Sequence, residues 1–215
     1  MRAAIDRVLM PVIRFLHDTL GLSPDQVSFA GLLVGLAAAG TVAAGRIAGG
    51  LLLMAIAQVM DALDGGIARR YNIQSPHGAR METICDRISE LAMFLALTIA
   101  GEVTAGMAAL AFAAILLVSA IEPRSHFDPG FKRFTLYFGW VAQMVFPCRG
   151  FQLAMHVIFL ANLSAFAIGT VLLDYRLQKE TDAEEIRHRA QLRATGVPLP
   201  PEDRPTILSR IASWF

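Results

Sequence analysis

Apolar residues fall in long blocks along this chain, and short polar or glycine-containing segments separate the blocks. A helix needs about 20 mainly apolar residues to cross a bilayer, so the blocks predict membrane-spanning helices, several of them marginal in length. We therefore expect an all-α integral membrane protein with six transmembrane helices. Their approximate ranges are residues 27–44, 51–63, 78–100, 103–121, 134–146 and 151–173.

In the first 20 residues the apolar positions recur at helical spacing and do not form a continuous block. Ile5, Leu9, Val12, Ile13 and Leu16 fall on one side of a helix, and charged residues flank them. This pattern predicts an interfacial amphipathic helix with its apolar face toward lipid, the alternative being a short helix packed on protein. The segment that follows predicts the start of the first membrane helix through an N-cap, a first-turn proline and a capping box: Ser23, Pro24 and Gln26.

The end of the chain differs in composition from the six apolar blocks. Residues 174–215 are charged and contain four prolines: Pro198, Pro200, Pro201 and Pro205. We predict a solvated cytoplasmic tail here, with a second short interfacial helix formed by Ile207, Leu208, Ile211, Trp214 and Phe215. The expected organisation is thus an interfacial helix (1–20), a membrane domain (21–173) and a tail (174–215).

Charge restricts the class and orients the chain. Only 17% of the residues are charged, against about 25% in soluble domains, and the net charge of +1 gives no reason to expect nucleic acid as a partner. Cationic residues concentrate in the segments that lie inside if the N-terminus is inside, whereas the outer turns hold only Arg46 and Arg149. The positive-inside rule then predicts a multi-pass protein of the cell inner membrane.

The two cysteines, Cys85 and Cys148, fit no metal or disulfide spacing, and we expect both to be packed thiols.

A cluster of carboxylates beside these apolar blocks requires an explanation, because a carboxylate at membrane depth is costly unless it is paired, hydrated or bound to a cation. Asp61 and Asp64 are three residues apart, and Glu82, Asp86 and Glu90 are four apart, so each set shares one helix face. Bringing the two faces together would create a pocket of oxygen ligands for a divalent cation. The orientation above places this pocket at the cytoplasmic face.

Glycines and arginines accompany the carboxylates. The glycines Gly65, Gly66 and Gly78 would allow backbone or ligand to approach closely. The neighbouring arginines provide charge for a phosphate: Arg69, Arg70, Arg80 and Arg87. The alternative is that Arg69, Arg80 or Arg87 forms salt bridges to the aspartates.

The stretch 61–90 resembles the signature of the CDP-alcohol phosphotransferase family, D-x2-D-G-x2-A-R-x8-G-x3-D-x3-D. Here the signature reads Asp61, Asp64, Gly65, Ala68, Arg69, Gly78, Glu82 and Asp86. All spacings agree, and the only departure is Glu82, where the family pattern has Asp. The resemblance covers roughly residues 20–125 well and the last two blocks only in general character.

The resemblance implies an activity: transfer of a substituted phosphate from a CDP-linked donor, usually CDP-diacylglycerol, to an alcohol, with release of CMP in phospholipid biosynthesis. It implies that Mg²⁺ or Mn²⁺ is held by Asp61, Asp64, Glu82 and Asp86, and that Asp86 is also the general base. It further implies that the CDP pocket is lined by Gly65, Ala68, Arg69 and Gly78, and that the protein is a homodimer.

Two other functions stay open at this stage. Because of the Glu82 departure, the chain is alternatively a non-catalytic member that binds CDP-lipid or metal without turnover. A small cation carrier is a third reading, although it would not need the glycines and Arg69 at this spacing. The segment 122–133 carries Arg124, His126, Lys132 and Arg133, which would receive a phosphorylated acceptor such as inositol or glycerol phosphate, or would be only a positive-inside signal.

Overall fold

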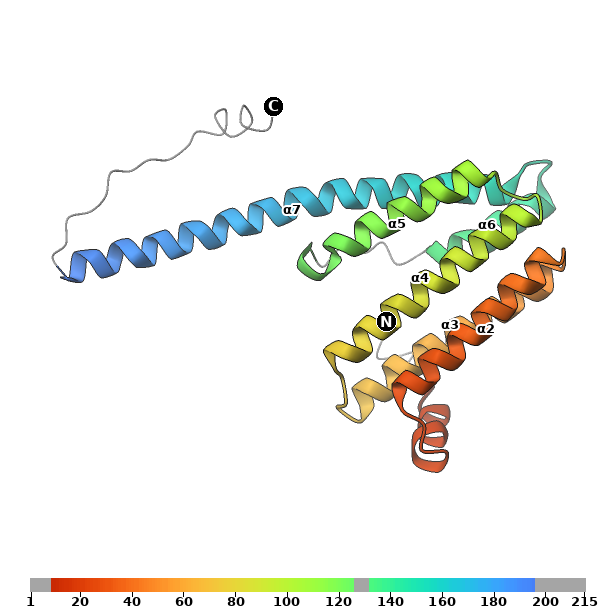
Figure 1. The fold of residues 1–215 in the computed structure, drawn as a ribbon, viewed down its shortest axis with the longest axis horizontal. Helices are drawn as coiled ribbons and strands as arrows, with labels where there is room; N and C mark the ends of the chain where they lie inside the picture. Colours follow the sequence, from red (N-terminus) through yellow and green to blue (C-terminus); the bar gives the residue numbers. More distant parts are fainter. Residues whose placement is uncertain (1–8, 126–131, 196–215) are drawn as a thin grey trace. The chain divides into compact units, whose positions relative to one another are not determined.

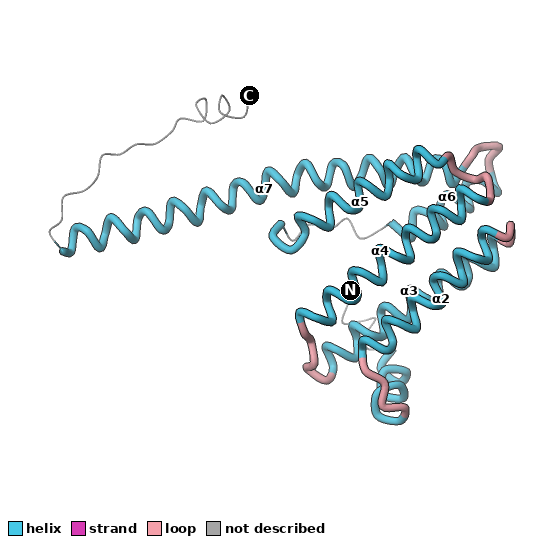
Figure 2. The backbone as a smooth tube through the Cα atoms, in the orientation of Figure 1, coloured by secondary structure: helices cyan, strands magenta, loops and turns pink. Residues whose placement is uncertain are grey.

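The computed structural model describes residues 9–125 and 132–195, and in these ranges every regular element is helical (Figure 2). Residues 9–14 form an α-helix that continues as a π-helix, η1. The elements in order are η1 (Phe15–Thr19), α2 (Pro24–Ala43), α3 (Ile47–Arg70), α4 (Pro76–Ile99), α5 (Ala105–Ser125), α6 (Lys132–Val145) and α7 (Gly150–Thr195). The prediction of an all-α protein is confirmed.

Three of the described helices are long and apolar enough to cross a membrane: α2, α3 and residues Gly150–Lys179 of α7. The apolar stretch of α5, Ala105–Ile121, is shorter. Each of the six apolar blocks lies within or largely within one of the helices α2–α7.

The chain divides into two compact units, residues 1–169 and 170–215, and the boundary falls inside α7. In the second unit α7 does not end where the charged residues begin. It continues through Asp174 to Thr195. Residues 174–195 are rich in Glu, Gln, Arg and Ala, which favour helix, and the next proline, Pro198, lies beyond the end of α7. The interfacial helix predicted for residues 207–215 lies outside the described residues.

Serine caps fix where α2 and α4 begin. The Ser23 side chain accepts the Gln26 N–H and the Gln26 side chain accepts the Ser23 N–H, which completes the predicted capping box. Ser75 is the N-cap of α4, and its hydroxyl oxygen accepts the Gly78 N–H at 3.0 Å. A proline follows each cap, where its missing N–H has no cost.

Within the first unit, α2 packs against both α3 and α4, and α4 contacts α5 (Figure 1). Small residues permit this closeness, as is typical of membrane helices. A Cβ on Gly35 of α2 would lie 2.9 Å from the Ser89 hydroxyl of α4, and a Cβ on Gly50 of α3 would lie 2.3 Å from a Val42 methyl of α2. The two helices that carry the acidic motif, α3 and α4, are therefore both held close to α2.

The N-terminal helix packs on protein, which corrects part of the prediction. Ile13 is 1% exposed and belongs to a cluster with Val27, Leu63 and Ile67, against which Leu9 and Leu16 also pack. Its neighbours Val12 and Phe15 are exposed. The prediction that Ile13 faces lipid was therefore wrong, because the start of α2 and the end of α3 form an apolar surface that this helix covers. Residues 1–8 lie outside the described residues.

Both cysteines are free thiols, as expected. Cys85 is buried, but Cys148 is exposed in the turn between α6 and α7, so the expectation of a packed thiol was wrong there.

Candidate metal and nucleotide site

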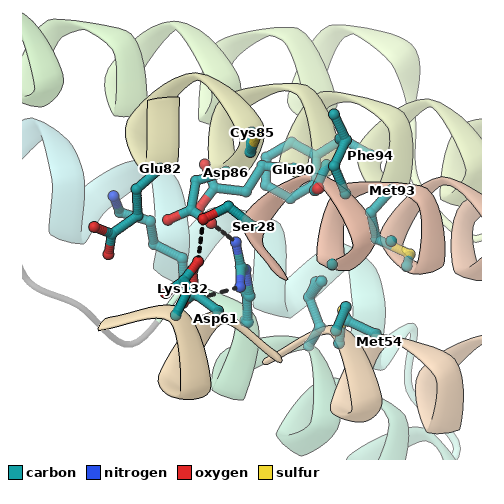
Figure 3. A pocket seen from close by; sticks show the side chains of 18 residues that line it. Ser28, Met54, Asp61, Glu82, Cys85, Asp86, Glu90, Met93, Phe94 and Lys132 are labelled. Carbon is teal, nitrogen blue, oxygen red and sulfur yellow. Dashed lines mark hydrogen bonds and ion pairs between the residues drawn. The ribbon is translucent and has the colours of Figure 1, made fainter. Parts of the chain in front are cut away.

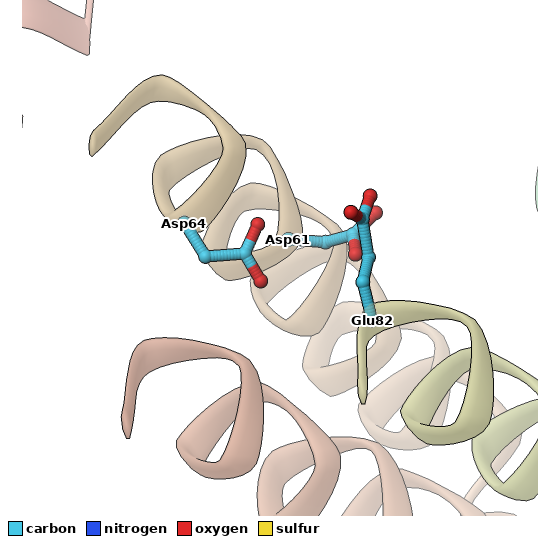
Figure 4. Close-up of side chains that lie close together, drawn as sticks. All are labelled: Asp61, Asp64 and Glu82. Atoms are coloured by element: carbon cyan, nitrogen blue, oxygen red, sulfur yellow. The ribbon is translucent and has the colours of Figure 1, made fainter. Parts of the chain in front are cut away.

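Three carboxylates converge where α3 approaches α4. Asp61 and Asp64 point from one face of α3, and Glu82 reaches across from α4 (Figure 4). One oxygen of each residue lies within 4.8 Å of an oxygen of the other two. The i, i+3 spacing on α3 gives the shared face, and the packing of both α3 and α4 on α2 brings Glu82 opposite it.

Asp64 is the most firmly held of the three carboxylates. It is 3% exposed, and it accepts hydrogen bonds from the Ser28 hydroxyl and from the Gly65 N–H. Ser28 comes from the first turns of α2, far from Asp64 in sequence, so the motif spacing gave no signal of this contact. These donors fix the direction of the Asp64 carboxylate.

Asp86 lies one turn beyond Glu82 and has a partner that the sequence analysis did not foresee. Arg133, at the start of α6, donates to Asp86 through Nη2, while its Nη1 lies 3.7 Å from Asp61 Oδ2. Arg87 instead forms an ion pair on its own helix, with its Nη1 2.7 Å from Glu90 Oε2 but without hydrogen-bond geometry. The positive charge beside Asp86 therefore comes largely from a distant segment.

A cavity of about 380 Å³, here called the glycine-side pocket, opens beside Asp64 and Glu82. Its walls include all four residues predicted to line a CDP pocket: Gly65, Ala68, Arg69 and Gly78. The remaining walls come from the capped starts of α2 and α4 and from the loop between α3 and α4, including Ser23, Asp25, Gln74 and Ser75. The positive ends of two helix dipoles thus border this pocket.

A second cavity of about 220 Å³, here called the arginine-side pocket, lies beside Asp61 and Asp86. Its cationic walls are Arg87, Lys132 and Arg133, and the others include Glu90, Gln58 and Phe134. Lys132 and Glu90 are each 6% exposed. Of the other predicted cations of segment 122–133, His126 lies outside the described residues, and the side chain of Arg124 is also outside them.

A smaller inner cavity of about 40 Å³ connects the two sets of walls (Figure 3). It shares Asp64, Glu82 and Ser28 with the glycine-side pocket and Asp61, Asp86 and Arg133 with the arginine-side pocket. Asp64 and Glu82 therefore border the glycine-side pocket, Asp61 and Asp86 border the arginine-side pocket, and all four line the inner cavity.

The loop between α3 and α4 is tied to the N-terminal helix. The Tyr71 hydroxyl donates to Asp18 Oδ1 at 2.5 Å, and the His17 ring lies 3.9 Å from the Tyr71 ring, centroid to centroid. The hydrogen bond to Asp18 raises the pKa of the Tyr71 phenol, because an ionised phenol could no longer donate this hydrogen bond to the carboxylate. Tyr71 precedes the loop residues that line the glycine-side pocket, so this contact anchors one wall.

The sequence profile of the CDP-alcohol phosphatidyltransferase family matches residues 22–173, which include the whole acidic motif and all three cavities. The chain therefore belongs to this family.

Relatives with assigned names share part of the chain. It is 29% identical over 124 residues to the archaetidylinositol phosphate synthase of Methanothermobacter thermautotrophicus, which covers 58% of this chain and 62% of that protein. It is 35% identical over 97 residues to the phosphatidylinositol phosphate synthase of Mycobacterium tuberculosis, covering 45% and 44%. The matched region is thus less than two thirds of the length of these relatives.

Solved structures show the same fold. The Mycobacterium tuberculosis phosphatidylinositol phosphate synthase with CDP-DAG bound superposes with a TM-score of 0.68 at 20% identity, over 78% of this chain and 94% of that one. The same enzyme in complex with manganese and citrate gives a TM-score of 0.62 at 21% identity, over 80% and 88%.

Proposed function

We propose that this protein transfers a phosphatidyl group from a CDP-linked lipid, CDP-diacylglycerol, to an alcohol and releases CMP, a reaction of phospholipid biosynthesis. The observation that carries this proposal is the position of the carboxylates between two pockets, one lined by the signature's glycines and one lined by cations. Two substrates can then reach the same charged centre from opposite sides.

The residues present fit a divalent cation. Asp61, Asp64 and Glu82 offer carboxylate oxygens within 4.8 Å of one another, and oxygen donors are what Mg²⁺ and Mn²⁺ prefer. Glu82 reaches the other two in spite of its departure from the signature, which favours a working site over a non-catalytic one. Asp86, one turn away, is available to a second cation. Such a cation, when bound, neutralises the charge of a diphosphate.

The glycine-side pocket suits the nucleotide end of the donor. Gly65 and Gly78 leave space for a ligand close to the backbone, and Arg69 brings a positive charge for a phosphate oxygen. The starts of α2 and α4 add the positive ends of two dipoles. Asp25 offers an acceptor for an amino or hydroxyl group of cytidine.

The arginine-side pocket suits an acceptor that carries its own phosphate. Nε and Nη1 of Arg87 are buried and have no hydrogen-bond acceptor among the described residues, while Lys132 and Arg133 line the same space. A phosphate would supply acceptors to such a group of donors. The names of the relatives, which are inositol phosphate lipid synthases, make an inositol phosphate the first acceptor to test.

We propose Asp86 as the group that accepts the proton. The acceptor hydroxyl oxygen forms a bond to the lipid-bearing phosphorus of the donor, and the bond from this phosphorus to the bridging oxygen of the diphosphate breaks. CMP leaves with the bridging oxygen, and the hydroxyl proton passes to the Asp86 carboxylate. Asp86 lines both the arginine-side pocket and the inner cavity, so it borders the path between the two substrates.

We further propose that α2–α7 are six membrane helices, that the N-terminus and both pockets face the cytoplasm at the inner membrane, and that the protein works as a homodimer. The three long apolar helices and the distribution of cations support the topology. The homodimer is an inference from the family alone.

The test is CMP release from CDP-diacylglycerol by the purified protein with Mg²⁺ or Mn²⁺ and a panel of acceptors: inositol phosphate, glycerol phosphate, and the same alcohols without phosphate. We expect release that depends on a phosphorylated acceptor. Replacing the base in Asp86→Asn should lower the rate by about 10²- to 10⁴-fold. Binding of CDP-diacylglycerol without release for any acceptor would reject the transferase and favour the non-catalytic alternative.

A further inference from the structure

Two short segments form a large part of the wall of the glycine-side pocket. The first is residues 23–25, at the start of α2, and the second is residues 73–75, in the loop before α4. The two helix starts lie close together, because a Cβ on Gly78 of α4 would lie 3.3 Å from Asp25 Oδ1 of α2. A small change in the separation of these segments would therefore change the width of the pocket.

The chain leading into each segment contacts the same side chain, His17. This residue lies in η1, on the N-terminal helix that packs against α2 and α3 (Figure 1). Its Nδ1–H donates to the carbonyl oxygen of Leu22 at 3.1 Å, one residue before the first segment. Its ring lies 3.9 Å from the ring of Tyr71, centroid to centroid, two residues before the second segment. His17 thus joins the two stretches of chain that enter the pocket wall.

Asp18 adds a second contact to the loop before α4. Its Oδ1 accepts a hydrogen bond from the Tyr71 hydroxyl at 2.5 Å. The residue after Tyr71 is Asn72, whose φ of 55° lies in the left-handed region, so the chain turns sharply before it reaches residues 73–75. The position of Tyr71 therefore sets where this wall begins. The hydrogen bond is exposed, so its net stabilisation is modest and its loss need not unfold the protein.

We propose that His17, Asp18 and Tyr71 form a clamp that fixes the separation of residues 23–25 and 73–75 and so shapes the pocket for the nucleotide of the donor. The inference rests on the proposed function, since it assigns the nucleotide to this pocket. All three are positioning residues, because none of them lines the pocket and each acts through the backbone beside it. The clamp holds the two helix starts in place before a ligand arrives, which reduces the ordering cost of binding.

The first measurement is hydrogen exchange of the peptide 72–79 in purified, ligand-free protein in detergent. Tyr71→Phe keeps the ring and removes the hydroxyl, and we expect exchange about fivefold faster than in the wild type. Asp18→Ala should have the same effect, whereas Asp18→Asn keeps an oxygen that accepts the hydroxyl and should stay close to the wild type. Tyr175→Phe, at an exposed tyrosine of α7, is the matched control.

Binding of CMP, measured by calorimetry in the presence of Mg²⁺, tests whether the clamp acts on the nucleotide. We expect the Kd to rise by about five- to tenfold in Tyr71→Phe and in Asp18→Ala. The double variant should bind no more weakly than either single one, because both substitutions remove the same hydrogen bond. His17→Ala, which loses contacts to both segments, should give the largest rise. Losses that add in the double variant would contradict a single clamp.

Turnover separates positioning from a merely structural role. In Tyr71→Phe, the KM for CDP-diacylglycerol should rise by the same factor as the Kd of CMP, while kcat and the KM for inositol phosphate stay within about twofold. A structural role would instead lower kcat together with the midpoint of thermal unfolding. Wild-type exchange of the peptide 72–79 in the variants, or an unchanged donor KM despite faster exchange, would overturn the proposal.

The clamp and the proposed transferase can fail separately. If exchange and CMP binding change as expected but no acceptor supports CMP release from CDP-diacylglycerol, the clamp stands and the transferase fails. If acceptor-dependent release is normal in the wild type and Tyr71→Phe leaves both exchange and donor KM unchanged, the transferase stands and the clamp fails.

Discussion

The two pockets that border the carboxylates are built from different materials. The glycine-side pocket has walls of small residues and helix ends, whereas the arginine-side pocket has walls of long charged side chains. On the proposed function, the first would recognise its ligand mainly by the space and the backbone dipoles that it offers, and the second mainly by charge. Substitutions that change volume should therefore act on one pocket, and substitutions that change charge should act on the other.

The largest effect tests the space in the glycine-side pocket. Ala68→Leu places a bulky side chain in its wall while retaining a good helix former. We expect binding of CDP-diacylglycerol to weaken by about 1–3 kcal/mol, roughly fivefold to more than a hundredfold, with little change in the KM for the acceptor. Ala109→Leu on the exposed side of α5 is the control. An unchanged KM for the donor would remove this pocket from the reaction.

An intermediate effect tests the boundary between the pockets. Ser28→Ala removes the hydroxyl that donates to Asp64, and we expect Mn²⁺ affinity to fall by about 10- to 100-fold, as for other groups that orient a metal ligand. Ser28→Thr keeps a hydroxyl and should restore most of the affinity. Thr41→Ala, which removes a hydroxyl bonded within α2 to Ala37, should leave Mn²⁺ binding as it is. Mn²⁺ titration of the purified variants decides the matter.

The smallest effect tests charge in the arginine-side pocket. Lys132→Met keeps the length of a buried side chain and removes its charge, and we expect the KM for inositol phosphate to rise by about tenfold. Donor KM should stay constant, because Lys132 does not line the glycine-side pocket. Lys179→Met on the exposed part of α7 is the control. If donor and acceptor KM rose together, the two pockets would not be separate in function.

The sequence predicted the glycine-side pocket better than the arginine-side pocket, and the reason is local geometry. Residues 61–86 form two helices joined by a short loop, so helical periodicity alone aligns Asp61 with Asp64 and the loop returns Glu82 opposite them. Gly65, Ala68, Arg69 and Gly78 follow from the same spacing, and the structure places all four in the lining of the glycine-side pocket.

Contacts that come from distant helices could not be read in the same way. Ser28 reaches Asp64 from α2, and Arg133 reaches Asp86 from α6, so both depend on how the helices pack rather than on spacing along the chain. The arginines that the alternative reading paired with the aspartates, Arg69, Arg80 and Arg87, are all near them in sequence. The prediction for Ile13 was wrong for a related reason: the apolar face of its helix predicts burial but does not indicate whether lipid or protein covers it.

The capped starts of α2 and α4 have a consequence for how such a protein can diverge. Part of what attracts an anion to the glycine-side pocket belongs to the backbone of these two helices, and it persists whatever side chains replace their neighbours. The cations of the opposite pocket are side chains, and each can be exchanged by a single codon change. On the proposed function, a lineage could therefore change its acceptor alcohol while the backbone contribution to nucleotide binding stays unchanged.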